Sequence, residues 1–333
     1  MYNDLRVYQV KIYINIYDIM LENNDEYWQN IKKFKERYYG SQDEYFEKNY
    51  PNNNNTKLIY KETVILEPNG SCGFNKQCSF PLSDLNTNKL VYKNLRVSSN
   101  KFDHTITRCH LECNGSTIDS VYGRTFKTLR YIYGIDDDTK LPFYFNMGND
   151  FLPNTFNTAI YIRFGPEQSD ICLDDFTLSV DIYEIDDVNF NEDTFTYNNA
   201  VVQCQYTGME SASKGTNALK FKTDFNHVME YILVSIPDTK ITDIILQLDG
   251  FDMHIPFEDL VCHDAHYIIP LTKSLNKEMI NEYGINFSRC NYCTISIKYD
   301  IITNEVFAPV YIYGISCNAI IAQNKMLGLM YSK

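Results

Sequence analysis

The stretch INFSRCNYCTISIKY, residues 285–299, decides which fold class the chain belongs to. From residue 294 onward every second residue is apolar (Ile295, Ile297 and Tyr299), and the residues between them are polar. Side chains of a β-strand alternate between its two faces, so this period of two is typical of a strand with one buried face. We therefore predict a β-strand from Thr294 to Tyr299.

Two cysteines in C-x-x-C spacing, Cys290 and Cys293, precede this strand. They could be half of a zinc site, a redox pair, or buried structural thiols. A zinc site needs a second Cys or His pair at suitable spacing, and a thioredoxin-like pair needs a βαβ context. The other candidate groups lack that spacing: Cys72 with Cys78; Cys109, His110 and Cys113; and Cys262, His263 and His266. We therefore predict structural thiols, with no metal site and no cofactor.

Composition and charge exclude several classes of protein. The 333 residues are enough for two domains of ordinary size, and 44% of them are hydrophobic, which is enough to build a core. A net charge of −13 argues against a nucleic-acid-binding surface. The first residues lack a basic segment followed by an apolar one, so we expect no signal peptide and a reducing compartment for the ten cysteines.

The chain contains an internal repeat with an offset of 135 residues. The strand pattern AIYIRF, starting at Ala159, returns as TISIKY, starting at Thr294. The same offset relates Asn114-Gly115 to Asp249-Gly250. Asn-Gly and Asp-Gly are strong signals for a two-residue β-hairpin turn, because both central residues need a positive φ. Two features with one offset indicate a tandem duplication.

We expect three segments: a leader over residues 1–55, a first domain over 56–190 and a second domain over 191–333. In the leader, residues 5–19 alternate like a strand, and a helix ending at Gly40 would carry one apolar face: Tyr27, Trp28, Ile31, Phe34 and Tyr38. A second helix is predicted from Ser116 to Gly134, with Ser116 and Asp119 as a capping box. Many short strands with turns between them predict a β-sandwich or barrel.

The order of the motifs over residues 111–333 resembles the double jelly-roll capsid proteins of the nucleocytoplasmic large DNA viruses. Val228 stands where that family has Pro, and Met326-Leu327-Gly328 stands where it has a Gly pair. The positions that carry the resemblance are Leu141, Pro142, Phe143, Asn226, His227, Leu248, Asp249, Gly250, Asp252, Asn286, Phe287, Ser288, Arg289, Gly328, Tyr331 and Ser332.

The resemblance implies an all-β chain of two tandem jelly-roll sandwiches with a few short helices. It implies a structural, non-enzymatic protein that forms pseudo-hexagonal homotrimers in an icosahedral shell. Its partners would be other copies, neighbouring trimers, minor capsid proteins and, indirectly, an internal membrane. It would be found in the virion and, during assembly, in virus factories of the host cytoplasm. Two alternatives stay open: a minor capsid or scaffold paralogue, and a carbohydrate-binding β-sandwich module or enzyme.

Overall fold

The structure of the chain is a computed structural model. It describes residues 25–40, 57–82, 85, 87, 89–146, 151–186, 194–205, 211–213, 218–235, 239–255, 260–272, 284–301, 307–324 and 326–330. The strand expected over residues 5–19 lies outside these residues.

The chain divides into two compact units that interleave in sequence. Unit 1 combines Met1–Asn49 with Gln203–Ser316, and unit 2 combines Tyr50–Val202 with Cys317–Lys333. The segment expected to be a separate leader therefore groups mostly with unit 1, and the C-terminal residues group with unit 2. The strand β20 (Tyr311–Gln323) begins in unit 1 and ends in unit 2.

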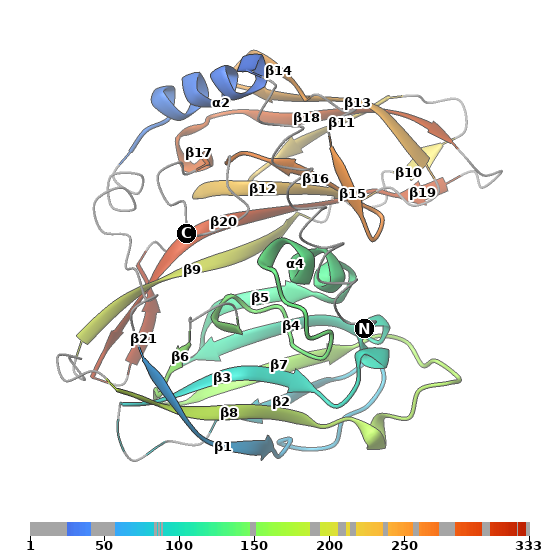
Figure 1. Cartoon of the computed structure of the whole chain (residues 1–333). Helices are drawn as coiled ribbons and strands as arrows, with labels where there is room; N and C mark the ends of the chain where they lie inside the picture. The colour runs from blue at the N-terminus through green and yellow to red at the C-terminus, as the bar shows by residue number, and fades with distance from the viewer. Residues whose placement is uncertain are drawn as a thin grey trace, which may run out of the picture. The chain divides into compact units, whose positions relative to one another are not determined.

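Unit 2 contains two four-stranded antiparallel sheets (Figure 1). The first has the order β2-β7-β4-β5: β2 (Gln77–Pro81), β7 (Thr158–Phe164), β4 (Ile106–Cys113) and β5 (Ser116–Tyr122). The second has the order β1-β8-β3-β6: β1 (Leu58–Leu66), β8 (Leu178–Ile185), β3 (Leu90–Val97) and β6 (Leu152–Pro153). Phe176, which precedes β8, packs its ring against Phe80, Phe102 and Phe164, at centroid distances of 5.0–5.9 Å.

Unit 1 repeats this topology. Its first sheet has the order β11-β18-β13-β14: β11 (Ala218–Thr223), β18 (Cys293–Ile301), β13 (Thr239–Leu248) and β14 (Phe251–Ile255). In the second, β20 pairs with β9 (Thr194–Gln205) and β12 (Val228–Ser235), and β12 pairs with β17 (Ile285–Asn286). The hairpin β15 (Val261–His263) and β16 (His266–Pro270) is added to β12. Strand β21 (Met326–Leu329) pairs with the end of β20, and the residues of both that pair belong to unit 2. A short pair, β10 (Ser211–Ser213) and β19 (Phe307–Pro309), is separate.

The repeat extends to the register of the strands. In unit 2, Leu111 is opposite Ile160, and in unit 1 the residues 135 positions later, Leu246 and Ile295, are opposite each other. The register also shifts at the same place, after Ile106 in unit 2 and after Ile241 in unit 1. The predicted duplication is confirmed at this level: the two strand patterns occupy equivalent positions in equivalent sheets.

Both predicted hairpin turns form. Asn114 and Gly115 have φ angles of 50° and 82°, and Asp249 and Gly250 have φ angles of 48° and 87°. Two successive positive φ angles are the signature of the turn type that matches the twist of a two-residue hairpin. Each unit combines a four-stranded sheet with a second sheet, of four strands in unit 2 and of seven strands where unit 1 is extended. This arrangement makes each unit a jelly roll, so the chain is a double jelly roll.

The predicted leader helix is confirmed as α2 (Asp25–Arg37), which lies along β14 and β17 of unit 1 (Figure 1). Its predicted apolar face is buried in the core of that unit: Tyr27, Trp28, Ile31, Phe34 and Tyr38. The Tyr27 hydroxyl donates a hydrogen bond to the Pro270 carbonyl at 2.5 Å. The helix is therefore an integral layer of unit 1.

The helix predicted from Ser116 is wrong over its first half. Residues 116–122 form strand β5, and the helix α4 covers only Phe126–Tyr133, ending at Gly134 with φ 63° as predicted. The Asn114-Gly115 turn folds the chain back onto β4, so the residues after it gain backbone hydrogen bonds as a strand. Asp119 is consequently a buried strand residue and caps no helix.

Two buried carboxylates of unit 2 have contrasting surroundings. Asp103 forms a bidentate ion pair with the equally buried Arg130, whose Nε also donates to the Lys140 carbonyl at 2.8 Å. Asp119 accepts from the Tyr144 backbone N–H at 3.3 Å, while its Oδ1 atom has no partner. Burial raises the pKa of Asp119 from 3.8 to about 8.

We predict that replacing Asp119 with Asn stabilises the protein at neutral pH. The native state keeps the Asp119 proton up to about pH 8, whereas the unfolded state releases it near pH 4. The stability that this group contributes is therefore present below pH 4 and is lost as pH rises toward 8. An amide stays neutral, so Asp119→Asn should gain up to about 5 kcal/mol at pH 7.5 and almost nothing at pH 4.

Urea titrations between pH 4 and 8.5 measure this difference. The control is Asp174→Asn, which neutralises an exposed carboxylate of the same unit and should change stability by less than about 0.5 kcal/mol at every pH. An Asp119→Asn variant whose stability differs from wild type by the same amount at pH 4 and pH 7.5 would contradict the prediction.

Candidate functional site

Two of the predicted motifs meet at one end of unit 1. His227, in the connection between β11 and β12, donates its backbone N–H to the Ser288 hydroxyl at 2.7 Å. Its carbonyl accepts from the Phe287 N–H at 2.8 Å. The Asn286 side chain in turn accepts from the Ser288 N–H at 3.2 Å and caps a short 3-10 helix, Phe287–Arg289. These hydrogen bonds join segments 61 residues apart in sequence.

The backbone before this junction approaches its neighbour so closely that a side chain has no room. A Cβ atom on Gly284 would lie 1.6 Å from the Met229 carbonyl oxygen. His227 itself has a φ of 68°, which non-glycine residues adopt rarely. The junction is therefore held by hydrogen bonds and close packing that outweigh a local backbone cost.

The Asp249-Gly250 turn forms a second junction beside the first. The Asp249 carboxylate accepts from the backbone N–H groups of Asn291 at 3.0 Å and Tyr292 at 2.8 Å. The Asp249 N–H donates to the Tyr292 carbonyl at 2.8 Å. Sequence reasoning missed Asn291 and Tyr292. The repeat could have indicated Tyr292, because Tyr292 lies 135 residues after Asn157. In unit 2 the Asn157 carbonyl accepts a hydrogen bond from the Asn114 N–H, as the Tyr292 carbonyl does from Asp249 in unit 1.

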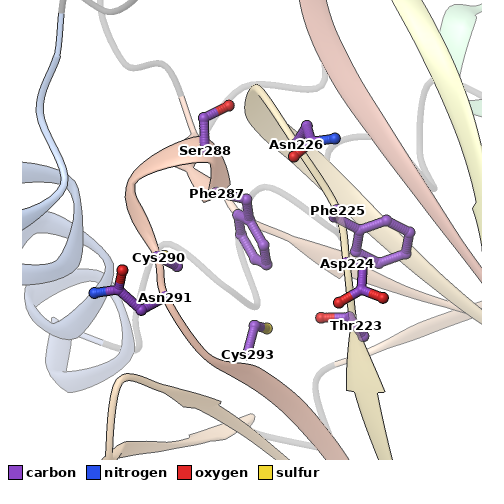
Figure 2. Close-up of a pocket in the computed structure, with 9 residues that line it drawn as sticks. All are labelled: Thr223, Asp224, Phe225, Asn226, Phe287, Ser288, Cys290, Asn291 and Cys293. Carbon is purple, nitrogen blue, oxygen red and sulfur yellow. The ribbon is translucent and has the colours of Figure 1, made fainter. Parts of the chain in front are cut away.

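A small polar hollow lies between these loops, with a volume of about 470 Å³ including the open solvent at its mouth. Figure 2 shows the rings of Phe225 and Phe287 on two facing segments, residues 223–226 and 287–293, and Cys293 at the lower end of the hollow. The lining residues come from the two connections: Thr223, Asp224, Phe225, Asn226, Phe287, Ser288, Cys290, Asn291 and Cys293.

The two cysteines of the C-x-x-C pair have different surroundings and form no hydrogen bond with each other. The Cys290 thiol donates to the Asn286 carbonyl at 3.8 Å, and Cys293 is buried in the core of unit 1. Burial raises the pKa of both thiols to about 12. Only the thiolate is a nucleophile or a metal ligand, so at neutral pH both groups pack as small apolar side chains.

An aromatic surface borders the same end of unit 1. The Arg37 guanidinium, at the end of α2, lies 4.0 Å from the ring centroid of Phe251, which is about half exposed. Phe34 contacts the same ring edge-on at a centroid distance of 6.4 Å. Burial, together with the nearby Cys290 and Asp249, raises the pKa of Tyr38 to about 12. The surface combines a cation with exposed aromatic area.

The remaining predicted positions lie elsewhere. Leu141, Pro142 and Phe143 are buried in unit 2, where the unpredicted Asn146 holds them. Its amide donates to the carbonyls of Leu141 at 2.7 Å and Leu95 at 2.9 Å.

Gly328 lies on β21, opposite Ile321, also in unit 2. Leu248 and Asp252 belong to the β13–β14 hairpin, Arg289 ends the 3-10 helix, and Tyr331 and Ser332 are outside the described residues.

Two kinds of feature are absent from the described residues. Within that part of the chain, no group of three or more His, Cys, Asp or Glu side chains is placed to hold a metal ion. No helix among the same residues has the length and apolar character needed to cross a membrane.

The chain was compared with known proteins at three levels. No family model matches it, and no curated protein matches it in sequence. Among solved structures it is similar to PBCV-1 VP54, in a crystal structure fitted into a reconstruction of the virophage Sputnik. The match has 15% identity and a TM-score of 0.66, and it covers 84% of this chain and 98% of that one.

A quasi-atomic model of the PBCV-1 virus capsid is similar to nearly the same degree. It matches with 16% identity and a TM-score of 0.65, again over 84% of this chain and 98% of that one. At such low identity the likeness shows the fold alone. That fold is the double jelly roll that the strand order of each unit already establishes.

We predict that Asp249 stabilises unit 1 through its two backbone hydrogen bonds and its tolerance of a positive φ. Asp249→Ala should cost about 1–3 kcal/mol in the free energy of unfolding, because two N–H donors lose their acceptor and alanine disfavours this φ. Asp249→Asn keeps an acceptor oxygen and should cost less than about 1 kcal/mol, since unit 2 has Asn114 at the equivalent turn.

Chemical denaturation of the three proteins measures this order. Asp252→Ala is the matched control, because Asp252 lies on the same hairpin, is exposed and accepts a hydrogen bond only from the Gln247 side chain among its described contacts. Equal losses from Asp249→Ala and Asp252→Ala, or a larger loss from Asp249→Asn than from Asp249→Ala, would show that the turn is held in another way.

Proposed function

We propose that this chain is a structural component of a viral capsid, and that its two jelly rolls form one building block of the shell. The observation that carries the proposal is the strand order and register shared by the two units. The structural match to PBCV-1 VP54 supports it, because it covers nearly all of that protein and both units of this one. A duplicated sandwich supplies two similar bodies from one chain.

The proposed assembly is a homotrimer. Three copies around a three-fold axis place six similar jelly rolls in a ring, which gives a nearly hexagonal outline from a simple cyclic assembly. Hexagonal blocks fill a lattice with their neighbours. The activity of the protein in this proposal lies in its contact surfaces and requires no reaction.

Unit 2 presents apolar side chains that suit such contacts. Strand β1 is at the end of its sheet, pairs only with β8 among the described strands, and exposes Ile59, Tyr60 and Ile65 to 41%, 53% and 62%. Strand β21 exposes Met326, and Met330 follows it with 39% exposure. Contiguous exposed apolar area on a soluble protein commonly marks an interaction surface.

We propose that the C-terminal residues contribute to the trimer. β21 pairs with the end of β20, and Leu327 is buried while the two methionines beside it face outward. Part of this apolar stretch therefore packs on its own unit, and part is left for a neighbouring copy. We propose that neighbouring trimers and minor capsid proteins are further partners, in the virion and in the host cytoplasm during assembly.

A minor capsid or scaffold role is the second candidate, and one observation favours it. The chain between β14 and the β17 segment contains only the short β15–β16 hairpin among its described residues. Large outward insertions are therefore absent from the described part of this connection. Protein quantification in purified virions separates the two roles, because a main shell protein is the most abundant chain and a scaffold is depleted from mature particles.

We predict that the purified full-length chain is a trimer at micromolar concentration. Light scattering coupled to gel filtration should give three times the chain mass of 38.9 kDa, and negative-stain images should show particles with a six-sided outline. A monomer of normal stability in light scattering, with no ring-shaped particles, would overturn the proposal. Binding to a glycan array by such a monomer would favour the carbohydrate-binding alternative.

We predict that the double variant Met326→Ser with Met330→Ser shifts the protein from trimer toward monomer. Burying a large apolar side chain contributes about 1.5–3 kcal/mol, so replacing two per chain removes a large share of a modest interface. Because both side chains are exposed within the chain, the unfolding temperature of the monomer should hardly change.

Light scattering over a dilution series measures the shift. The control, Tyr292→Ser, removes a large exposed side chain of unit 1 that belongs to neither proposed contact surface, and it reports whether the loss of any such group dissociates the protein. An unchanged trimer in the methionine variant at the lowest measurable concentration would exclude the C-terminal contact.

A further inference from the structure

The thiols of Cys72 and Cys78, both in unit 2, are in contact. The Cys72 thiol donates to the Cys78 sulfur, and the two Sγ atoms are 3.2 Å apart. A disulfide bond has a sulfur–sulfur distance of about 2.05 Å, so an approach of about 1 Å would connect them. Both cysteines are free in the structure. Their spacing, with five residues between them, suggested no metal site and did not indicate this contact.

The contact is set by a fold-back of the chain before strand β2. Asn69 donates its backbone N–H to the Ser79 carbonyl at 2.7 Å, which pairs the two ends of the segment. The turn is closed by the Lys76 N–H donating to the Gly73 carbonyl at 3.2 Å. The Asn75 N–H donates to the Gly165 carbonyl at 2.8 Å, which ties the tip to the end of β7. These bonds hold the two cysteines side by side without a covalent link.

The other described cysteines have different partners. Cys113 donates to the Thr155 hydroxyl and the Phe156 carbonyl, and Cys290 donates to the Asn286 carbonyl. Cys172 is exposed on its own at the surface of unit 2. Among the eight cysteines that the structure describes, Cys72 and Cys78 form the one hydrogen bond between two thiols. The C-x-x-C pair, which the sequence made the more conspicuous candidate, does not form one.

The two thiols differ in access to solvent. Cys72 is partly exposed in the loop, whereas Cys78 is 3% exposed on β2. Burial and the neighbouring Cys78 raise the pKa of Cys72 to about 12, so little thiolate is present at neutral pH. A small oxidant would therefore meet Cys72 first and react with it slowly. Cys78 is the adjacent thiol that completes the reaction.

We propose that Cys72 and Cys78 form a reversible intramolecular disulfide when the protein is exposed to a peroxide. The Cys72 thiol releases its proton, the thiolate attacks one oxygen of hydrogen peroxide and the O–O bond breaks. The products are a Cys72 sulfenic acid and hydroxide, which takes up the released proton to give water. The Cys78 sulfur then attacks the Cys72 sulfur, which releases a second water and leaves the disulfide. Two thiols lose two electrons and two protons, and one peroxide is reduced to two waters.

The disulfide would connect the loop before β2 to β2, the outer strand of the sheet β2-β7-β4-β5. A covalent link restricts the unfolded chain and so stabilises the folded one. The oxidised protein should therefore resist unfolding of this edge more than the reduced protein. A thiol reductant reverses the reaction. The inference concerns unit 2 alone and does not depend on the proposed capsid role.

The test uses the position of Lys76 between the two cysteines. Reduced full-length protein is treated with a small excess of hydrogen peroxide, and remaining thiols are alkylated with iodoacetamide in denaturant. Trypsin cleaves after Lys61, Lys76 and Lys89, so Cys72 and Cys78 fall on separate peptides. Mass spectrometry should detect these two peptides joined by a disulfide at least tenfold sooner than any other cysteine pair, and dithiothreitol should separate them.

Two variants make the result specific. Cys72→Ser should abolish the cross-link and leave the Cys78 peptide alkylated, whereas Cys172→Ser should form the cross-link at the wild-type rate. Peroxide should raise the Tm of wild type and of Cys172→Ser, and it should not raise the Tm of Cys72→Ser. Conversion of Cys72 to sulfinic acid with Cys78 still alkylated would overturn the proposal. So would earlier cross-linking of another pair, or a cross-link between two chains.

Discussion

In both units a turn of two residues with positive φ fixes the register of the central strands. Asn114-Gly115 and Asp249-Gly250 are the only residues between the two strands of their hairpins, β4 and β5 or β13 and β14. A slip of one residue would turn every apolar side chain of the sheet to the solvent face. The turn therefore decides which residues of the hairpin lie opposite each other: Leu246 opposite Met253 in unit 1 and, beyond a register shift, Leu111 opposite Asp119 in unit 2. The packing of the second sheet in each unit depends on that choice.

Short polar side chains complete the strand ends that the sheets leave unpaired. Asp249 accepts from two backbone N–H groups, and Asn146 replaces a strand partner for Leu95 by donating and accepting at 2.9 Å. Asn154 contacts the backbone of residue 85 in the same two ways. A buried backbone group without a partner costs free energy, so each of these amides supports a loop that β-pairing cannot reach. The abundance of asparagine in this chain has a structural use here.

The comparison between sequence and structure is most informative at residues 116–125. Apolar spacing and a Ser-x-x-Asp pattern predicted a helix there, while the Asn-Gly pair just before predicted a hairpin. The two predictions conflict, since a hairpin requires a second strand. The structure shows the strand, because residues 116–122 pair with β4, with one register shift between Thr117 and Asp119. A long-range partner outweighed a local preference, whereas α2 formed as predicted because its apolar face agrees with its surroundings.

The sequence by itself determined the strand periodicity, the two hairpin turns, the helix α2 and the repeat of 135 residues, because each depends on neighbouring residues or on a short spacing. Only the tertiary structure decided that His227 binds Ser288, that the C-x-x-C cysteines have separate partners, and that Cys72 lies against Cys78. It also decided that residues 1–49 and 203–316 form one compact unit. The reason is physical: these outcomes depend on backbone hydrogen bonds between segments far apart in the chain, and no local pattern specifies which segments will meet.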